Sequence, residues 1–401
     1  MKPLLLITFG VFAGVLAAPA QFNFNFSFNS GSTGTTALNI TTNTTLDLPP
    51  DGILHYTTIN VSNGATLRFN RNAANTPVYL LALGDVNIAG TIDVSGFSPT
   101  SSSVGGQGGP GGFDGGFPAF NGLRAGDGYG PGGGGSGDFH NNICGGTASS
   151  AGPGTYSTLA NNNSASQRKG LRYGSQLLVP LVGGSGGGGA NSPGLGGGGG
   201  GGAVLIASST RISVSGTIRA DGGTGATYLF QFVCGPYHLN PGSGGAIRLL
   251  APVVAGSGLL SANGPTTGGA ALNNFGRVRV DSIDRRGIFF NATGDYSIGT
   301  YMTTFPAPRL DIVEVGGTNI VQGSGPVAIQ LPTNSDTNRT VTVQARNFGT
   351  MVTNLVVLTP ENGPRSVYTN IIDNIANNPA TGTVTVGIPP NTIVTISAWK
   401  P

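Results

Sequence analysis

Hydrophobic residues alternate with polar ones in short stretches that recur along the first three quarters of the chain. The stretch Val78 to Ala82, followed by Val86 to Ile92, returns as Val204 to Ser208 followed by Ile212 to Ile218, at a constant offset of 126 residues. Further copies follow the same pattern at Ile53 to Phe69, Gly245 to Leu260 and Gly276 to Phe290. Alternation with a period of two predicts strands that bury one face.

A repeat unit of about 20 residues cannot bury such a face alone, but stacked copies can cover one another. We therefore expect an all-β fold in which residues 51–305 form a parallel, right-handed β-helix, or solenoid. Three glycine-rich insertions, 97–201, 222–243 and 264–275, then leave the solenoid at its corners. Long insertions are tolerated there because loop-closure entropy grows only slowly with length.

Glycine is concentrated in and around these insertions. The doublets Gly201-Gly202 and Gly244-Gly245 precede equivalent strands, which indicates a sharp corner or a close approach of two backbones. The other glycines have two interpretations. Segments 183–202 and 104–116 can pack as extended polyglycine helices, backbone bonded to backbone, or they can be flexible, solvated loops. Of the two, we expect the loops, pinned by aromatic anchors.

Residues 306–401 contain less glycine and carry short alternating segments at regular spacing. This pattern favours an Ig-like or fibronectin-like β-sandwich, without the Cys and Trp signature of a true immunoglobulin domain. The seven expected strands are Leu310 to Val315, Val327 to Leu331, Thr340 to Ala345, Leu355 to Leu358, Val367 to Ile371, Thr381 to Val386 and Thr392 to Trp399.

The N-terminus predicts export. Residues 1–20 have the layout of a secretory signal peptide that ends in Ala18-Pro19-Ala20. An Asn-, Thr- and Phe-rich segment, residues 21–50, follows. Its alternating phenylalanines predict a strand that caps the open end of the solenoid. The second interpretation is self-association through residues 21–30, with this strand donated to a neighbouring molecule to build an extracellular filament.

The amino-acid composition limits the classes of partner that the protein can bind. Charged residues make up 9% of the chain and the formal net charge is +3, whereas soluble domains average roughly 25% charged residues. Nucleic-acid binding needs clustered basic residues, so we expect none. No later segment has the 18 or so continuous apolar residues of a membrane span. A secreted or cell-surface protein is the expectation.

Two cysteines lie in the insertions, each separated by three residues from a histidine: His140 with Cys144, and Cys234 with His238. Because an exported chain meets oxidising conditions, we expect a Cys144–Cys234 disulfide. Two Cys and two His could instead form a tetrahedral zinc site.

Carboxylates that recur in the repeat are the candidates for catalysis. Asp93 and Arg219 occupy the same slot of the repeat, and Asp221, Arg279 and Asp281 lie in or after neighbouring strands. Clustered carboxylates on one exposed face would serve a carbohydrate-active β-helix enzyme, a polysaccharide lyase or hydrolase. The competing interpretation, a surface ion pair of little energetic weight, is the one that we favour.

The stretches GGGGGGGAVLIASSTRISVSGTIRADGG and GSGGAIRLLAPVVAGSGLLSANG resemble glycine-rich exported bacterial proteins, mostly of unassigned function, whose repeats are similar to those of β-helix adhesins. The resemblance covers roughly residues 50–290. It implies a fold type and a surface role, and it supplies no catalytic residue.

These observations favour a structural or adhesive surface protein over an enzyme, without excluding the enzyme. The aromatic side chains of the first insertion, Phe113, Phe117, Phe120 and Tyr129, would contact a polysaccharide or a neighbouring cell, because aromatic faces stack on sugars. No motif for a nucleotide or other cofactor is present, and we expect none.

Overall fold

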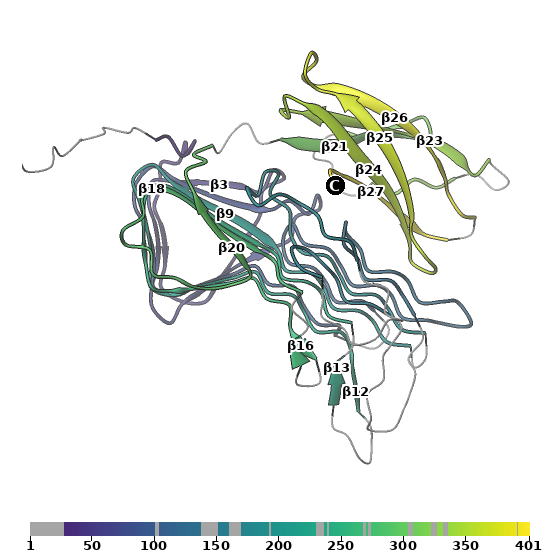
Figure 1. The fold of residues 1–401 in the computed structure, drawn as a ribbon, viewed down its shortest axis with the longest axis horizontal. Coiled ribbons are helices and arrows are strands. Elements are labelled where there is room, and N and C mark those ends of the chain that lie inside the picture. The colour runs from purple at the N-terminus through teal and green to yellow at the C-terminus, as the bar shows by residue number, and fades with distance from the viewer. Residues whose placement is uncertain are drawn as a thin grey trace, which may run out of the picture.

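The structure, a computed structural model, describes residues 28–100, 104–137, 151–159, 170–191, 194–229, 236–238, 240–267, 270–271, 274–303, 308–321, 327–331, 336–390 and 392–401. Every regular element in these ranges is a strand (Figure 1). None of them contains a helix of the length and hydropathy that a membrane crossing requires.

Parallel strands form two sheets that share one core. The first sheet has ten strands: β1 (Leu38–Ile40), β3 (Ile53–Tyr56), β4 (Ile59–Val61), β6 (Val78–Ala82), β7 (Val86–Ile88), β9 (Ala203–Ser208), β10 (Arg211–Val214), β14 (Ala246–Gly256), β18 (Arg277–Asp284) and β20 (Asp295–Gly299). The second sheet has six: β2 (Thr44–Asp47), β5 (Thr66–Asn70), β8 (Thr91–Asp93), β11 (Thr217–Arg219), β15 (Leu259–Ser261) and β19 (Asn291–Thr293).

The repeat offset of 126 residues is the register in which these strands pair. Leu80 lies opposite Ile206, and Ile92 lies opposite Ile218. One inward-facing column crosses the first sheet through Leu54, Leu80, Ile206, Leu249, Val280 and Ile298. Its four inner members are 0% exposed, whereas Ile298 on the last strand is 40% exposed. Each copy therefore covers the next, as the sequence pattern indicates.

The predicted fold class, a β-helix followed by an Ig-like sandwich, is wrong. In a β-helix the strands of each turn belong to separate parallel sheets. Here β14 pairs with both β9 and β10, so the strands β3, β6 and β9 and the strands β1, β4, β7 and β10 belong to one ten-stranded sheet. This sheet bends back and, with the second sheet, nearly closes around the core (Figure 1). The strand β14 continues through Pro252, where its partner changes: residues up to Leu250 pair with β9, and residues from Val253 pair with β10.

The first sheet is buried on both faces along its central strands. Its inner face packs into the shared core, and its outer face packs against Tyr156, Tyr173 and Leu178. All six residues of β9 are buried. This two-sided burial explains why β9 reads Ala-Val-Leu-Ile-Ala-Ser, with little alternation.

The glycine-rich segments are ordered, so the loop interpretation is wrong. In segment 183–191 every third N–H donates in the same direction: Gly184, Gly187 and Ala190 donate to the carbonyls of Gly201, Gly198 and Leu195. The other two positions of each triplet donate to other segments: Gly186 and Gly189 to Tyr129 and Gly126, and Gly188 and Asn191 to Gly152 and Gly137. Three residues per turn with all hydrogen bonds between segments is the geometry of packed polyproline II helices.

We call the segments 104–116, 125–137, 151–155, 183–191, 195–202 and 240–245 the glycine bundle; they extend from the ends of the parallel strands (Figure 1). Its backbones lie too close together for side chains. A Cβ on Gly200 would lie 2.0 Å from the carbonyl oxygen of Gly184, and one on Gly197 would lie 2.0 Å from that of Gly187. Glycine is required here for close approach.

Seven further strands form the C-terminal sandwich of two antiparallel sheets, ordered β22-β21-β23-β26 and β25-β24-β27. They are β21 (Arg309–Val315), β22 (Thr318–Asn319), β23 (Asn338–Arg346), β24 (Met351–Pro360), β25 (Ser366–Asp373), β26 (Ala380–Gly387) and β27 (Val394–Trp399). The four-stranded ABED sheet of an immunoglobulin domain is absent from it. The hairpin turn after β24 instead places β25 beside β24, and the predicted strand at 327–331 is not formed.

The sandwich packs on the glycine bundle. The backbone N–H of Arg365 donates to Asp127 Oδ2 at 3.1 Å, and its guanidinium donates to the carbonyl of Gly130 at 3.2 Å. Phe113 makes an edge contact with Trp399, with ring centroids 6.0 Å apart. The bundle is thus the platform that positions the sandwich.

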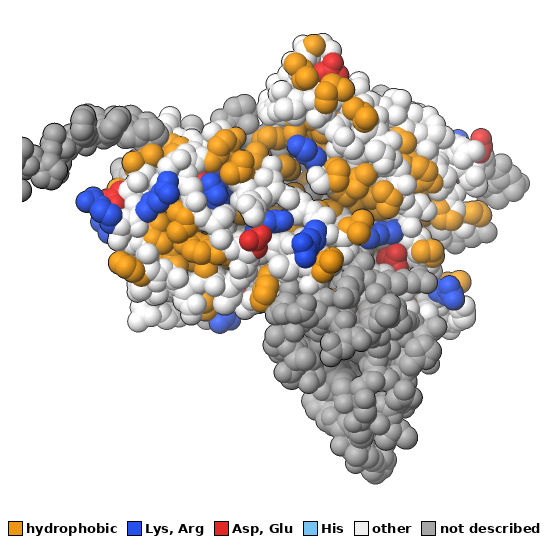
Figure 2. All heavy atoms as spheres, in the orientation of Figure 1, with side chains coloured by type: hydrophobic (Ala, Val, Ile, Leu, Met, Phe, Trp, Pro, Cys, Tyr) orange, Lys and Arg blue, Asp and Glu red, His pale blue; other side chains and the backbone are white. Residues whose placement is uncertain are grey.

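Two predicted N-terminal features lie outside the described residues: the signal peptide, 1–20, and residues 21–27 of the phenylalanine-rich strand. Of the latter, Phe28 is described and packs in the cluster on the outer face of the first sheet. Two short hairpins complete the elements: β12 (Thr227–Leu229) with β13 (Pro236–His238), and β16 (Thr266–Thr267) with β17 (Ala270–Ala271). Charged side chains are sparse on the surface shown in Figure 2.

We predict that Gly200→Ala lowers the free energy of unfolding by about 2–4 kcal/mol, because the new methyl group overlaps a carbonyl oxygen that cannot move without breaking bundle hydrogen bonds. Urea unfolding measures the change. Gly387→Ala, where a Cβ would lie 3.5 Å from the Tyr368 hydroxyl and 4.0 Å from Asn338 Oδ1, is the matched control. Equal effects of the two substitutions would contradict close packing in the bundle.

Candidate functional site

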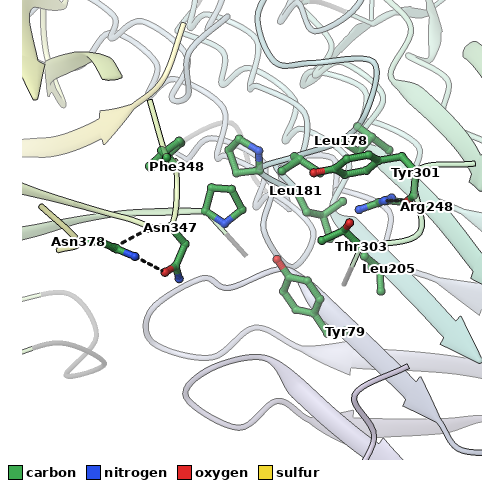
Figure 3. Close-up of a pocket in the computed structure, with 14 residues that line it drawn as sticks. Tyr79, Leu178, Leu181, Leu205, Arg248, Tyr301, Thr303, Asn347, Phe348 and Asn378 are labelled. Atoms are coloured by element: carbon green, nitrogen blue, oxygen red, sulfur yellow. Dashed lines mark hydrogen bonds between the residues drawn. The ribbon is translucent and has the colours of Figure 1, made fainter. Parts of the chain in front are cut away.

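A cavity of about 410 Å³ lies where the first sheet, the segment Leu178 to Leu181 and the sandwich meet (Figure 3). Its floor comes from the first sheet, and its opposite wall comes from two loops of the sandwich. The chain between them adds Tyr301, Thr303 and Pro308. This volume falls in the range of small-molecule sites.

The floor consists of one outward-facing column of the first sheet. Tyr79 on β6, Leu205 on β9 and Arg248 on β14 are consecutive partners in register. Figure 3 shows the side chains of Tyr79 and Arg248 directed at the cavity. Burial raises the pKa of Tyr79 to about 12, and the charges of Arg248 and Arg309 offset part of this effect. The hydroxyl of Tyr79 is therefore neutral at physiological pH.

The sandwich wall is held by asparagines. Asn347 N donates to Asn378 Oδ1, and Asn378 Nδ2 donates to Asn347 Oδ1, both at 2.9 Å. Asn374, which is 1% exposed, accepts from the N–H of Phe348 at 2.8 Å. These bonds join the β23–β24 and β25–β26 loops and present the Phe348 ring to the cavity.

Beside the floor, two arginines share one buried carboxylate. Asp281 Oδ2 accepts from Nε and Nη2 of Arg248, each at 3.2 Å. Its Oδ1 accepts from Nε and Nη2 of Arg279 at 3.0 and 2.7 Å, and from the backbone N–H of Tyr301 at 2.9 Å. Asp281 is 0% exposed and Arg248 is 2% exposed. Burial lowers the pKa of Arg248, and Asp281 counteracts that shift.

The predicted catalytic carboxylates are not all brought together. Asp93 and Arg219 do lie opposite each other in the second sheet, but Arg68 bonds the Asp93 carboxylate at 2.8 Å. Asp221 accepts from the Ser261 hydroxyl at 2.6 Å and from the N–H of Asn263 at 2.8 Å. Asp281 lies on the first sheet, within the arginine cluster. The first two have structural partners, and the third bonds Arg248, which lines the cavity.

The predicted binding aromatics are also divided. Phe113 contacts Trp399, and Tyr129 is hydrogen-bonded to Thr395, so both pack against the sandwich. Phe117 is half-buried, and Phe120 alone of the four is exposed, at 67%. As a set they do not form an open aromatic surface.

The predicted disulfide and the zinc alternative cannot be placed. His140, Cys144 and Cys234 lie outside the described residues, and His238 is described only as a backbone position of β13. Within the described ranges, no group of three or more His, Cys, Asp or Glu side chains is arranged to hold a metal ion.

Sequence reasoning missed most of the cavity. The repeat register alone could have placed Tyr79, Leu205 and Arg248 in one slot, because they lie at matching positions of three copies. Asn347, Phe348 and Asn378 carried no local signal, since only the docking of the sandwich brings them to the sheet.

Comparisons with models of protein families, with curated proteins and with solved structures found no match for this chain.

We predict that Asp281→Asn destabilises the fold by about 3–5 kcal/mol, because it leaves Arg248 and Arg279 buried without a counter-charge. Chemical unfolding measures this loss. Asp284→Asn is the control: its partner Arg286 has a side chain that is 90% exposed, and the midpoint should barely move. A similarly small effect at Asp281 would rule out the electrostatic role.

We also predict an alkaline loss of stability. The pKa of Tyr79 is about 12 in the folded chain against an ordinary value of 10.0. The tyrosine therefore ionises first in the unfolded chain as the pH rises. The contribution of neutral Tyr79 to the free energy of unfolding is fully present below pH ~10, and about 2–3 kcal/mol of it is lost as the pH approaches ~12. Unfolding measured across this range should show a shallower pH dependence for Tyr79→Phe than for the wild type. Identical slopes would contradict it.

Proposed function

We propose that this chain is a secreted or cell-surface adhesive protein that binds polysaccharide in the cavity between the first sheet and the sandwich. The observation that carries the proposal is the lining of that cavity. It combines the rings of Tyr79, Tyr301 and Phe348 with the amides of Asn347 and Asn378.

This combination fits sugars. Aromatic rings provide flat apolar surfaces for the C–H faces of a sugar ring, and amides are both donors and acceptors for hydroxyl groups. The walls are held in place before any ligand arrives, since the Asn347–Asn378 pair and Asn374 fix the loops. Prior ordering of this kind lowers the entropic cost of binding.

The rest of the molecule supports an extracellular structural role. The glycine bundle is held by backbone hydrogen bonds rather than charges, and it carries the sandwich at a fixed position. The leader-like residues 1–20 and the resemblance to exported surface proteins agree with this role.

A glycan array probed with the mature protein tests the proposal. We predict specific binding that Phe348→Ala weakens roughly ten-fold or more, because it removes a ring from the cavity wall. Phe120→Ala, which removes an exposed ring of the first insertion, is the matched control and should bind as the wild type.

Three outcomes would contradict this assignment. Absence of binding to any glycan would remove the polysaccharide ligand. Loss of binding in Phe120→Ala alone would move the site to the insertion. Shortening of the bound polysaccharide during incubation would favour the carbohydrate-active enzyme instead.

A further inference from the structure

The cavity is bordered by more positive than negative charge. Arg248 and Arg279 share the single carboxylate of Asp281, so this buried cluster carries one excess positive charge. None of the 14 residues that line the cavity is acidic.

A second cluster repeats the imbalance on the sandwich side. Arg309 and Arg346 share Asp311, at 2.6 and 3.7 Å. Arg309 acts electrostatically on Tyr79, and Arg346 directly precedes the lining residue Asn347. Lys400 Nζ lies 5.8 Å from the centre of the Phe348 ring.

Arg248 has donor capacity left over. Its Nε and Nη2 bond Asp281, and Nη2 also donates to the carbonyl of Tyr301 at 2.8 Å. No bond from Nη1 to the described residues is formed, and Arg248 lines the cavity. Because Arg248 is 98% buried, its excess positive charge costs free energy unless an anion neutralises it.

We infer that the ligand is an acidic glycan whose carboxylate binds Arg248 at the cavity floor, while its sugar rings contact Phe348 and the tyrosines. This inference rests on the proposed function and deepens it. A charge-assisted hydrogen bond to guanidinium is stronger than a neutral one, so the acid group would dominate selectivity.

Isothermal titration with tetragalacturonate and with its fully methyl-esterified form tests the inference, because the two differ in charge and hardly in shape. We predict that the acid binds at least about ten-fold more tightly. Its affinity should fall as NaCl rises from about 20 to about 500 mM, whereas that of the ester should not.

Arg248→Met should abolish this difference between the acid and the ester. The variant is expected to fold, because Asp281 keeps Arg279 as a neutralising partner. Arg286→Met, at a side chain that is 90% exposed in the turn after β18, is the control and should preserve the difference. If Arg248→Met does not fold, the salt dependence of acid and ester binding by the wild type still shows whether the ligand's negative charge contributes to binding.

The outcomes separate the two proposals. Equal binding of acid and ester would overturn the acidic ligand and leave a neutral polysaccharide as the partner. Binding of a sulfated oligosaccharide or inorganic phosphate, without the galacturonate, would overturn the carboxylate. Binding of none of these, together with an empty glycan array, would remove the proposed function as well.

Discussion

The close approach of glycine backbones is the constraint on which this structure depends. Within the bundle, backbone N–H groups donate to carbonyls of neighbouring segments at distances such as 2.7 Å from Gly184 to Gly201. At positions such as Gly197 and Gly200 no Cβ fits between segments, so this region is stabilised by hydrogen bonds where most domains rely on apolar burial. Glycine loses the most backbone entropy on ordering. The dense hydrogen bonding and the attached parallel strands offset that loss together.

This platform determines where the cavity lies. Asp127 and Gly130 of the bundle hold Arg365 of the sandwich, while the first sheet supplies Tyr79 and Arg248. The sandwich therefore meets the sheet at a fixed distance, and the cavity lies between two bodies with separate cores. Arrangements of this kind commonly host ligands, because neither core has to be opened to make room.

The sequence predicted local pairing better than global arrangement. Alternation and the 126-residue offset indicate which residues pair, and Leu80 and Ile206 do pair. These two signals do not reveal that residues Leu249 to Val254 form one continuous strand that joins β9 and β10 in a single sheet. Burial on both faces of β14 removes the alternation of apolar and polar residues. The three-residue spacing of Val104, Gln107, Pro110 and Phe113 among glycines was an available signal for packed polyproline II helices. Contacts such as that of Phe348 with the cavity depend on docking, which local patterns do not encode.

The inward column that ends at Ile298 has a consequence for dynamics. Central members have a strand on each side, whereas the last strand, β20, pairs only with β18. In a linear array of nearest-neighbour interfaces, a terminal unit has half the stabilising contacts and opens at the lowest free energy. Amide hydrogens of β20 should thus exchange with solvent sooner than those of β9. Because Tyr301 lies two residues beyond the end of β20, such fraying would give the cavity a route by which large ligands enter.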